Sequence, residues 1–332
     1  MRLLSTRQRE LLKLIVEDYI KTARPIGSKS LCETLHCSSA TIRNEMSLLE
    51  EMGLLEKTHT SSGRVPSEKG YRYYVDNIMK PKELSGEDVL KLQTIFRNNS
   101  LMLSDTIVKS MEIISELTSY TSVILGKSSR DNKISKVEVV PLDENNFIAI
   151  VVTDKGHVEH KKMFIKEAIQ IDEIKKVVEI INRHIIGTPI DEVSEKLEFE
   201  VKPVIGNEIK QKEVLYNAFY NVFTDLTQSS NVKVNNNYKM LKEPEFNNAD
   251  KIRLMLEKFD DKNMVNHIRE DEDGVHIYIG SESEFDDDVA IIKTKYSVAG
   301  EEGTLALIGP KRMEYDKVTA LLNYIKENIE KE

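Results

Sequence analysis

The stretch at residues 38–66, SSATIRNEMSLLEEMGLLEKTHTSSGRVP, decides how the N-terminal part of the chain folds. The serine pair at its start can cap a helix in which Ile42, Met46 and Leu49 share the inward face, and Gly53 ends that helix. A short strand-like run follows, then a polar tip, then a returning strand that the final proline stops. This order predicts a helix followed by a β-hairpin wing.

Two more helices are expected before this stretch and one after it. Ser5 and Gln8 form a capping-box pattern, and the apolar residues that follow repeat at helical spacing: Leu12, Ile15, Val16, Tyr19 and Ile20. Ser28 can cap a short second helix, and Ser67 can cap the helix after the wing. Residues 1–80 therefore predict a winged helix-turn-helix domain.

The third helix of such a domain lies in the major groove of DNA and contacts base edges near its N-terminus. The polar residues there are Ser38, Ser39, Thr41, Arg43, Asn44 and Ser47. Arginine pairs with guanine, asparagine pairs with adenine, and hydroxyls suit either bases or phosphates. The wing adds His59, Thr60, Ser61, Ser62 and Arg64. These side chains suit contacts with phosphate or the minor groove, so both sets are predicted to bind DNA.

Charge is distributed unevenly along the chain. The formal net charge is −9, which by itself argues against a nucleic-acid partner. Residues 1–80, however, carry 13 Lys/Arg against 10 Asp/Glu, whereas the remainder carries 34 against 46. A modestly basic head on an acidic body is compatible with DNA binding by the head alone.

Composition excludes several classes of protein. No run of about 18 apolar residues is present, so no membrane span or membrane partner is expected. The charged N-terminus has no signal-peptide core. Cys32 and Cys37 are the two cysteines, too few for a disulfide framework or a four-cysteine zinc site. We expect a cytoplasmic protein with no cofactor or metal.

The remainder of the chain predicts one α+β domain with a mostly helical insertion. Strand-like runs at 121–165 and again after Gly274 flank a helical block at 195–271, which includes an Asn-rich stretch at 231–238 expected as an exposed loop. The expected domains are 1–80, 81–194, the insertion 195–271, and 272–332. One helix of the insertion concentrates aromatic residues, namely Tyr216, Phe219, Tyr220 and Phe223. Its apolar face is predicted to lie at a homodimer interface.

Other patterns do not support a catalytic or ligand site. Gly126-Lys127-Ser128 ends like a phosphate-binding loop, but Thr121 stands where the first glycine of that motif is required. His157 and His160 are three apart in a predicted strand and so point to opposite faces. No set of nucleophile, base and orienting residue is recognisable. We therefore predict that the chain is not an enzyme.

Several runs resemble the HrcA family of heat-inducible repressors of bacterial chaperone operons. They are Ala40–Met46 with Leu49-Glu50 and Gly53-Leu54-Leu55, Gly63–Pro66 with Gly70–Val75, and Ile308–Met313 with Tyr315 and Val318. The resemblance implies a dimer that binds an inverted repeat in double-stranded DNA upstream of chaperone genes. It also implies a GAF-like body, an inserted dimerisation segment, and dependence on a GroEL-type chaperonin for the active state.

Two other hypotheses remain open from the sequence. In one of them, the chain is an allosteric enzyme or a small-molecule sensor with a DNA-binding head, and the GAF-like body is the sensor. A dry pocket lined by convergent polar groups would favour that hypothesis, whereas a closed body filled by side chains favours the repressor. In the other, the winged helix binds RNA, which a preference for a duplex inverted repeat over single strands would exclude.

Overall fold

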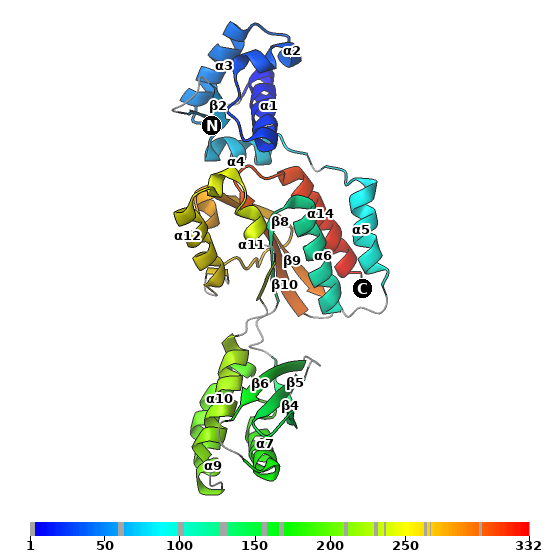
Figure 1. Cartoon of the computed structure of the whole chain (residues 1–332). Coiled ribbons are helices and arrows are strands. Elements are labelled where there is room, and N and C mark those ends of the chain that lie inside the picture. The colour runs from blue at the N-terminus through cyan, green and yellow to red at the C-terminus, as the bar shows by residue number, and fades with distance from the viewer. Residues whose placement is uncertain are drawn as a thin grey trace. The chain divides into compact units, whose positions relative to one another are not determined.

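A computed structural model of the chain shows how its elements are arranged (Figure 1). The residues that it describes are 4–58, 63–80, 82–98, 103–126, 132–154, 158–165, 169–208, 212–228, 232–235, 237–261, 264–265, 267–298 and 301–331. The chain divides into two compact units, one made of residues 1–125 and 232–332 and the other of residues 126–231. Within the described residues, no helix is both long enough and apolar enough to cross a membrane.

The first unit begins with the predicted winged helix-turn-helix. Its elements are α1 (Thr6–Thr22), the 3-10 helix η1 (Ser28–Leu31), α2 (Cys32–Leu35), α3 (Ser39–Glu51), β1 (Leu55–Lys57), β2 (Arg64–Pro66) and α4 (Glu68–Asn77). The capping box is present on α1, where Ser5 and Gln8 each accept a backbone N–H from the other. Strands β1 and β2 pair antiparallel and form the base of the wing.

The rest of the first unit is built on a five-stranded antiparallel sheet in the order β7-β3-β10-β9-β8. The strands are β3 (Thr121–Leu125), β7 (Val232–Asn235), β8 (Val275–Ile279), β9 (Val289–Val298) and β10 (Glu301–Pro310). The Asn-rich stretch expected as a loop therefore supplies strand β7, whose residues pair with β3. The strand has the sequence VKVN, and its two β-branched valines favour an extended chain that can pair at the sheet edge.

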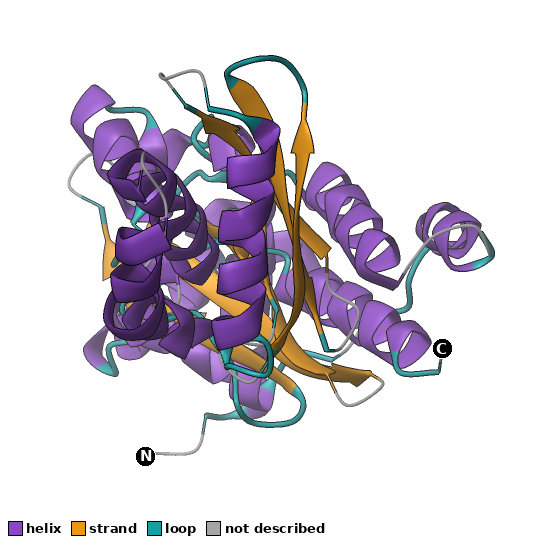
Figure 2. Cartoon of the chain, turned by 90° about the horizontal axis from the view of Figure 1, so that it is seen from below, coloured by secondary structure: helices purple, strands orange, loops and turns teal. Residues whose placement is uncertain are grey.

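Helices cover both faces of this sheet (Figure 2). Helices α6 (Leu103–Thr118) and α14 (Tyr315–Ile329) belong to one apolar core, and α5 (Gly86–Phe96) contacts α6. The opposite core includes residues of α11 (Asn237–Met240), η5 (Pro244–Phe246) and α12 (Ala249–Asp260). With both faces covered, the first six residues of β9 are buried without interruption. The predicted α+β class is confirmed.

The second unit combines a three-stranded sheet with helices. Strands β4 (Ile134–Pro141), β5 (Asn146–Thr153) and β6 (Val158–Phe164) pair antiparallel in sequence order. The helical elements are α7 (Ile171–Ile185), η3 (Ile190–Glu192), α8 (Val193–Lys196), the π-helix η4 (Leu197–Val201), α9 (Lys202–Glu208) and α10 (Lys212–Gln228). Alternate residues of β5 are buried, so one sheet face packs on helices. As far as the structure describes this unit, the other face is uncovered.

The division into units differs from the one expected from the sequence. The expected insertion was 195–271, whereas the segment that forms its own unit is 126–231. The difference arises because β4, β5 and β6 pair with one another and not with β3 or β8. In addition, residues 232–271 supply β7 and α12, which complete the first unit.

Candidate nucleic-acid interface

Helix α3 is positioned by its cap and by its buried face. Ser38 is the N-cap residue, and its hydroxyl accepts a hydrogen bond from the backbone N–H of Thr41 over 3.2 Å. Ile42, Met46 and Leu49 are at most 3% exposed and pack into the core of the winged helix. Both features match the prediction and leave the other face of the helix in solvent.

Two predicted contact residues lie exposed on that face. Arg43 and Asn44 occupy the second turn of α3, and neither side chain makes a hydrogen bond or ion pair with the described residues. A guanidinium and a carboxamide in this position present hydrogen-bonding groups to a partner without first breaking internal contacts. They are therefore the strongest candidates for reading base edges.

The four predicted hydroxyls of α3 are already hydrogen-bonded. Ser38 and Thr41 lie 2.9 Å apart through their hydroxyl oxygens at the cap. Ser39 is bonded to Ser28 of η1 over 2.8 Å, and Ser47 donates to the backbone oxygen of Arg43 over 3.1 Å. These side chains shape the helix and its turn. A hydroxyl oxygen retains acceptor capacity, so the exposed Ser38 remains able to contact a phosphate-bound water.

Arg64 has a different environment from the one expected of a free wing arginine. Its side chain is 12% exposed, and its Nε donates to a carboxylate oxygen of Glu50 on α3 over 2.7 Å. Its backbone N–H and C=O both pair with those of Ile26 over 2.9 Å. The guanidinium thus joins the wing to the recognition helix, a pairing that spacing alone did not indicate. The remaining predicted wing residues, His59, Thr60, Ser61 and Ser62, lie outside the described residues.

Lys29 is an exposed cation that the sequence prediction did not select. It follows Ser28, whose hydroxyl is bonded to Ser39 at the start of α3, so Lys29 lies close to the N-terminus of the recognition helix. No side-chain hydrogen bond or ion pair occupies it within the described part of the chain. The helix before α3 crosses the DNA backbone in this motif. The position of Lys29 in the first turn of that helix could therefore have identified it from the sequence as a candidate contact.

The predicted dimer residues are mostly internal. Tyr216, Phe219 and Phe223 lie on α10 and are at most 6% exposed, within the core that α10 shares with β4–β6 and α7. Tyr220 is partly buried and its ring contacts that of Tyr216. The aromatic face of α10 is therefore covered by its own unit. Helical periodicity identified an apolar face correctly but could not identify what covers it.

Comparisons with known proteins agree with this geometry. A family model described as "Winged helix-turn-helix transcription repressor, HrcA DNA-binding" matches residues 3–77, and one described as "HrcA protein C terminal domain" matches residues 104–319. The chain belongs to the HrcA family. Proteins named "Heat-inducible transcription repressor HrcA" from Bacillus pumilus (strain SAFR-032) and Lysinibacillus sphaericus are each 37% identical over 333 residues, covering 98% of this chain and 97% of each relative.

A solved structure shares the fold of this HrcA family member. It is titled "Crystal structure of a hypothetical protein at 2.2 A resolution", is 23% identical, and covers 99% of this chain and 98% of its own with a TM-score of 0.67. The matched winged-helix family makes DNA the partner of the head. Among the described residues of this HrcA chain, no group of three or more His, Cys, Asp or Glu is arranged to hold a metal ion.

Proposed function

We propose that this chain is a cytoplasmic homodimeric repressor that binds an inverted-repeat operator in double-stranded DNA through helix α3 of each protomer. The observation that carries the proposal concerns Arg43 and Asn44, whose side chains bond to no described residue. They lie on the solvent face of a helix whose other face is buried. One such helix reads only a few base pairs. Two copies related by a two-fold axis read two half-sites, which requires an inverted repeat.

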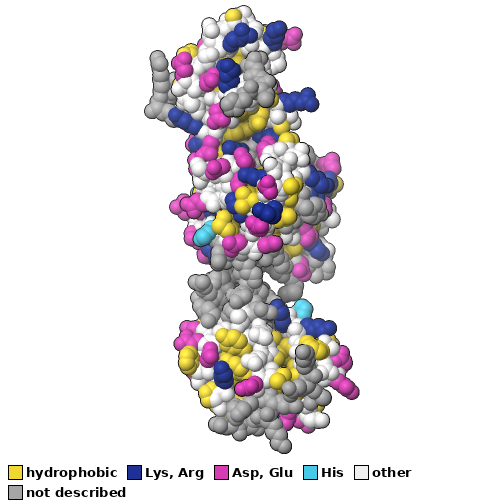
Figure 3. Space-filling view, turned by 60° about the vertical axis from the view of Figure 1, so that its left-hand side comes forward, with side chains coloured by type: hydrophobic (Ala, Val, Ile, Leu, Met, Phe, Trp, Pro, Cys, Tyr) yellow, Lys and Arg dark blue, Asp and Glu magenta, His cyan; other side chains and the backbone are white. Residues whose placement is uncertain are grey.

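The uncovered face of the β4–β6 sheet is the surface that best supports dimer formation. Along the central strand this face carries Ile148, Ile150 and Val152, which are only partly buried. Beside them, Val158 is 57% and Phe164 is 63% exposed. Figure 3 shows hydrophobic side chains on the surface of this unit. Apolar residues grouped on an open sheet face are typical of a protein–protein interface.

A second copy of the same unit is a suitable partner for this face. In a two-fold contact both copies use the same surface, so this face must be complementary to itself. Lys136 and Glu138 of β4 project beside the apolar residues and form an ion pair within the chain. An ion pair within each copy reduces the repulsion between the two copies at this part of the face.

The regulated genes and the mode of control follow from the family resemblance. The relatives are named heat-inducible transcription repressors, so we propose that the operator lies upstream of chaperone genes. Heat would unfold part of the repressor population, and a GroEL-type chaperonin would return it to the DNA-binding form when free. Marginal stability is sufficient for such control, because a change of about 1–2 kcal/mol alters the folded fraction several-fold.

The body of the first unit supports the repressor over the ligand sensor. We propose that it is GAF-like, with helices on both faces of its antiparallel sheet. Between α12 and the sheet, the space is filled by Met240, Phe246, Met255 and Phe259, each at most 5% exposed. A core filled by side chains leaves the folding state, and not ligand occupancy, as the variable that controls activity.

Footprinting of the purified protein on its own genomic DNA tests the proposal. We expect protection of an inverted repeat whose two halves are equally protected, upstream of chaperone genes. Protection of a single unrepeated site would contradict the dimer. Stronger binding to single-stranded RNA than to the duplex would contradict the DNA operator.

A further inference from the structure

Helix α4 joins the winged helix to the sheet of the first unit through an apolar contact. Tyr71 of α4 is 2% exposed, and its ring centroid lies 6.0 Å from that of Tyr315, which begins α14 and is fully buried. One continuous apolar core includes both residues and extends into the winged helix and the body. Apolar burial holds the two parts together, but it is not directional.

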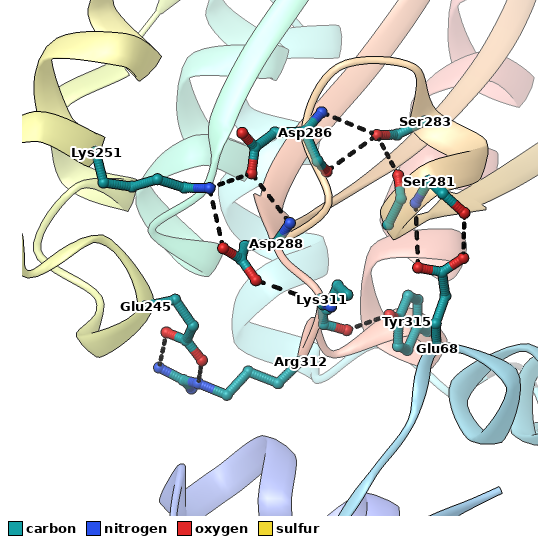
Figure 4. A network of polar contacts seen from close by, with 11 residues as sticks. Glu68, Glu245, Lys251, Ser281, Ser283, Asp286, Asp288, Lys311, Arg312 and Tyr315 are labelled. Atoms are coloured by element: carbon teal, nitrogen blue, oxygen red, sulfur yellow. Dashed lines mark hydrogen bonds and ion pairs between the residues drawn. The ribbon is translucent and has the colours of Figure 1, made fainter. Parts of the chain in front are cut away.

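Two polar residues of α4 add direction to this contact. Arg72 donates from Nη2 to the backbone oxygen of Ile277 over 2.5 Å and from Nε to Glu282 over 3.1 Å. One turn earlier, the Glu68 carboxylate accepts the backbone N–H of Ser281 over 3.1 Å and also the Ser281 hydroxyl (Figure 4). A guanidinium donates, and a carboxylate accepts, hydrogen bonds in defined directions. These bonds therefore fix the orientation of α4 on the body and also add to the stability of the contact.

The 3-10 helix η6 (Gly280–Ser283) is shaped to receive Glu68. Gly280 has a φ of +57°, and a Cβ placed there would lie 2.1 Å from the Glu68 carboxylate oxygen Oε2. A side chain at this position would therefore be strained and would displace the carboxylate. The close approach depends on glycine.

A third polar tie lies at the end of α1. Arg312, which follows β10, donates from Nη1 to the backbone oxygen of Ile20 over 3.2 Å. Its side chain is 12% exposed and is held by Glu243 and Glu245 on either side. The C-terminal end of an α-helix has unpaired carbonyl oxygens, which a fixed cation satisfies. The winged helix is thus held at two of its helices.

We propose that Glu68, Arg72 and Arg312 are positioning residues that set the operator spacing. Their contacts with η6, Ile277 and Ile20 are here named the head–body seam. This inference rests on the proposed dimer. The seam fixes each recognition helix at one distance and rotation from the body of its own protomer. Heads that cannot turn on their bodies accept a narrower range of half-site spacings than heads that can.

Chain geometry shows why a seam is needed. Without the seam and the apolar contact beside it, the segment between α4 and α5, residues 78–85, would be the tether of the head. A flexible eight-residue tether has a root-mean-square end-to-end distance of about 15 Å. DNA rises about 3.4 Å per base pair, so such a tether would tolerate changes of several base pairs. Strict spacing therefore requires a head that is fixed on the body, and the seam is the directional part of that attachment.

Spacer variants of the operator test the inference in the full-length protein. The probes are duplexes carrying one half-site, the protected repeat, and the repeat with its spacer changed by two or five base pairs. We compare the wild type with the double variant Glu68→Ala/Arg72→Ala and with Arg72→Lys. Glu87→Ala/Lys91→Ala is the matched control, because it removes an exposed ion pair of α5 that lies outside the seam.

Wild type and control are expected to lose at least about tenfold in affinity for the repeat with two added base pairs, which rotate one half-site by about 70°. In the double variant this loss should shrink to threefold or less, while half-site affinity stays within twofold. Arg72→Lys, which keeps the charge but not the fork, should fall between the two. An unchanged spacer profile in the double variant would overturn the inference.

A distance measurement separates this inference from the dimer proposal. Spin labels at Lys13→Cys in the head and Arg253→Cys in the body, both exposed, are introduced into a Cys32→Ser/Cys37→Ser background. Labelled chains are diluted into unlabelled protein. A distance distribution that is narrow in the wild type and broader in the double variant supports the seam. This result would stand even if the wild type bound the half-site and the repeat equally, which would contradict the dimer. Equal widths in both proteins would overturn the seam.

Discussion

Arg64 in the wing and Glu50 on the recognition helix form an ion pair in which Nε of the arginine lies 2.7 Å from the carboxylate. The pair fixes the wing relative to α3 before any DNA is bound. Its existence changes what the removal of Arg64 is expected to do.

Replacing Arg64 with alanine is expected to lower operator affinity without changing its salt dependence. A lost phosphate contact would reduce the slope of log affinity against log salt by about one, whereas a displaced wing leaves that slope unchanged. The free energy of unfolding should also fall by about 1 kcal/mol, because the partly exposed pair is worth more than a surface pair and less than a buried one. Filter binding across salt concentrations and urea unfolding provide the measurements.

The reversed pair Glu50→Arg/Arg64→Glu is the control for this prediction. It should recover part of the affinity that either single change loses, because the attraction between the two positions is restored. If the slope falls by one in Arg64→Ala and the reversed pair recovers nothing, Arg64 contacts phosphate directly.

Replacing Arg43 with alanine should weaken specific binding by about 1–3 kcal/mol and relax base preference at one position in each half-site. The guanidinium is exposed and unengaged within the described residues, so its loss leaves the fold unchanged. Selection of bound sequences from a randomised operator measures the change in preference. A variant that loses equal affinity for every sequence would show that α3 does not read bases through this residue.

Charged substitutions in the second unit should separate folding from assembly. Phe164→Glu, at a side chain that is 63% exposed, should produce monomers that remain folded, with the circular dichroism spectrum of the wild type. Phe219→Glu, at a side chain that is 1% exposed, should destabilise the unit by more than the roughly 3–5 kcal/mol that truncating a buried phenylalanine costs. Sedimentation and circular dichroism distinguish the two effects, and a dimeric Phe164→Glu protein would remove this sheet face from the interface.

Asp286 should contribute to loss of stability in acid. Burial disfavours its charge, but hydrogen bonds from Lys251, the Asp288 backbone and Lys258 outweigh burial and lower its pKa. A carboxyl with a lowered folded-state pKa stabilises the fold above its unfolded pKa, and this contribution is lost as pH falls through and below about 4. Asp286→Asn should therefore be less stable than wild type at pH 7, and the difference should shrink towards pH 3. A constant difference across urea titrations would contradict this assignment.

Mild heating should reduce DNA binding by the purified protein, and chaperonin with ATP should restore it. The expected cause is partial unfolding, since a fold of marginal stability loses its native population over a few degrees. Gel-shift titration before heating, after heating and after chaperonin treatment measures the bound fraction. A bound fraction that chaperonin never raises, at temperatures where circular dichroism reports partial unfolding, would contradict the proposed control.

Local features of the fold could be predicted from the sequence, whereas distant pairings could not. The caps at Ser5 and Ser38 and the buried face of α3 depend on neighbours within one or two helical turns, and the structure has them as expected. The boundary of the inserted unit depends on whether β3 pairs with β4 or with β10, which begins at residue 301. Nothing in the alternation of apolar residues specifies such a partner.

The same limit applies to individual side chains of the candidate site. Arg43 could be selected because an exposed position on a predicted helix follows directly from helical periodicity. The partner of Arg64 lies 14 residues away, and the cover of Phe219 is formed by strands and helices of its own unit. Both depend on tertiary packing, so their roles became clear only from the structure.

The place where the second unit joins the first has a consequence for the order of folding during synthesis. Leu125, the last residue of β3, pairs with Val232, the first of β7, so the 106 residues between them leave and return at one point of the sheet. Closing a disordered loop of that length costs about 4 kcal/mol of chain entropy. If the second unit folds first, less disordered chain remains to be closed between Leu125 and Val232, and this cost is reduced. The ribosome also releases them before β8, β9 and β10 exist. Nascent chains should therefore form the second unit before the five-stranded sheet. They complete that sheet, which supports the DNA-binding head, only when about the last hundred residues emerge.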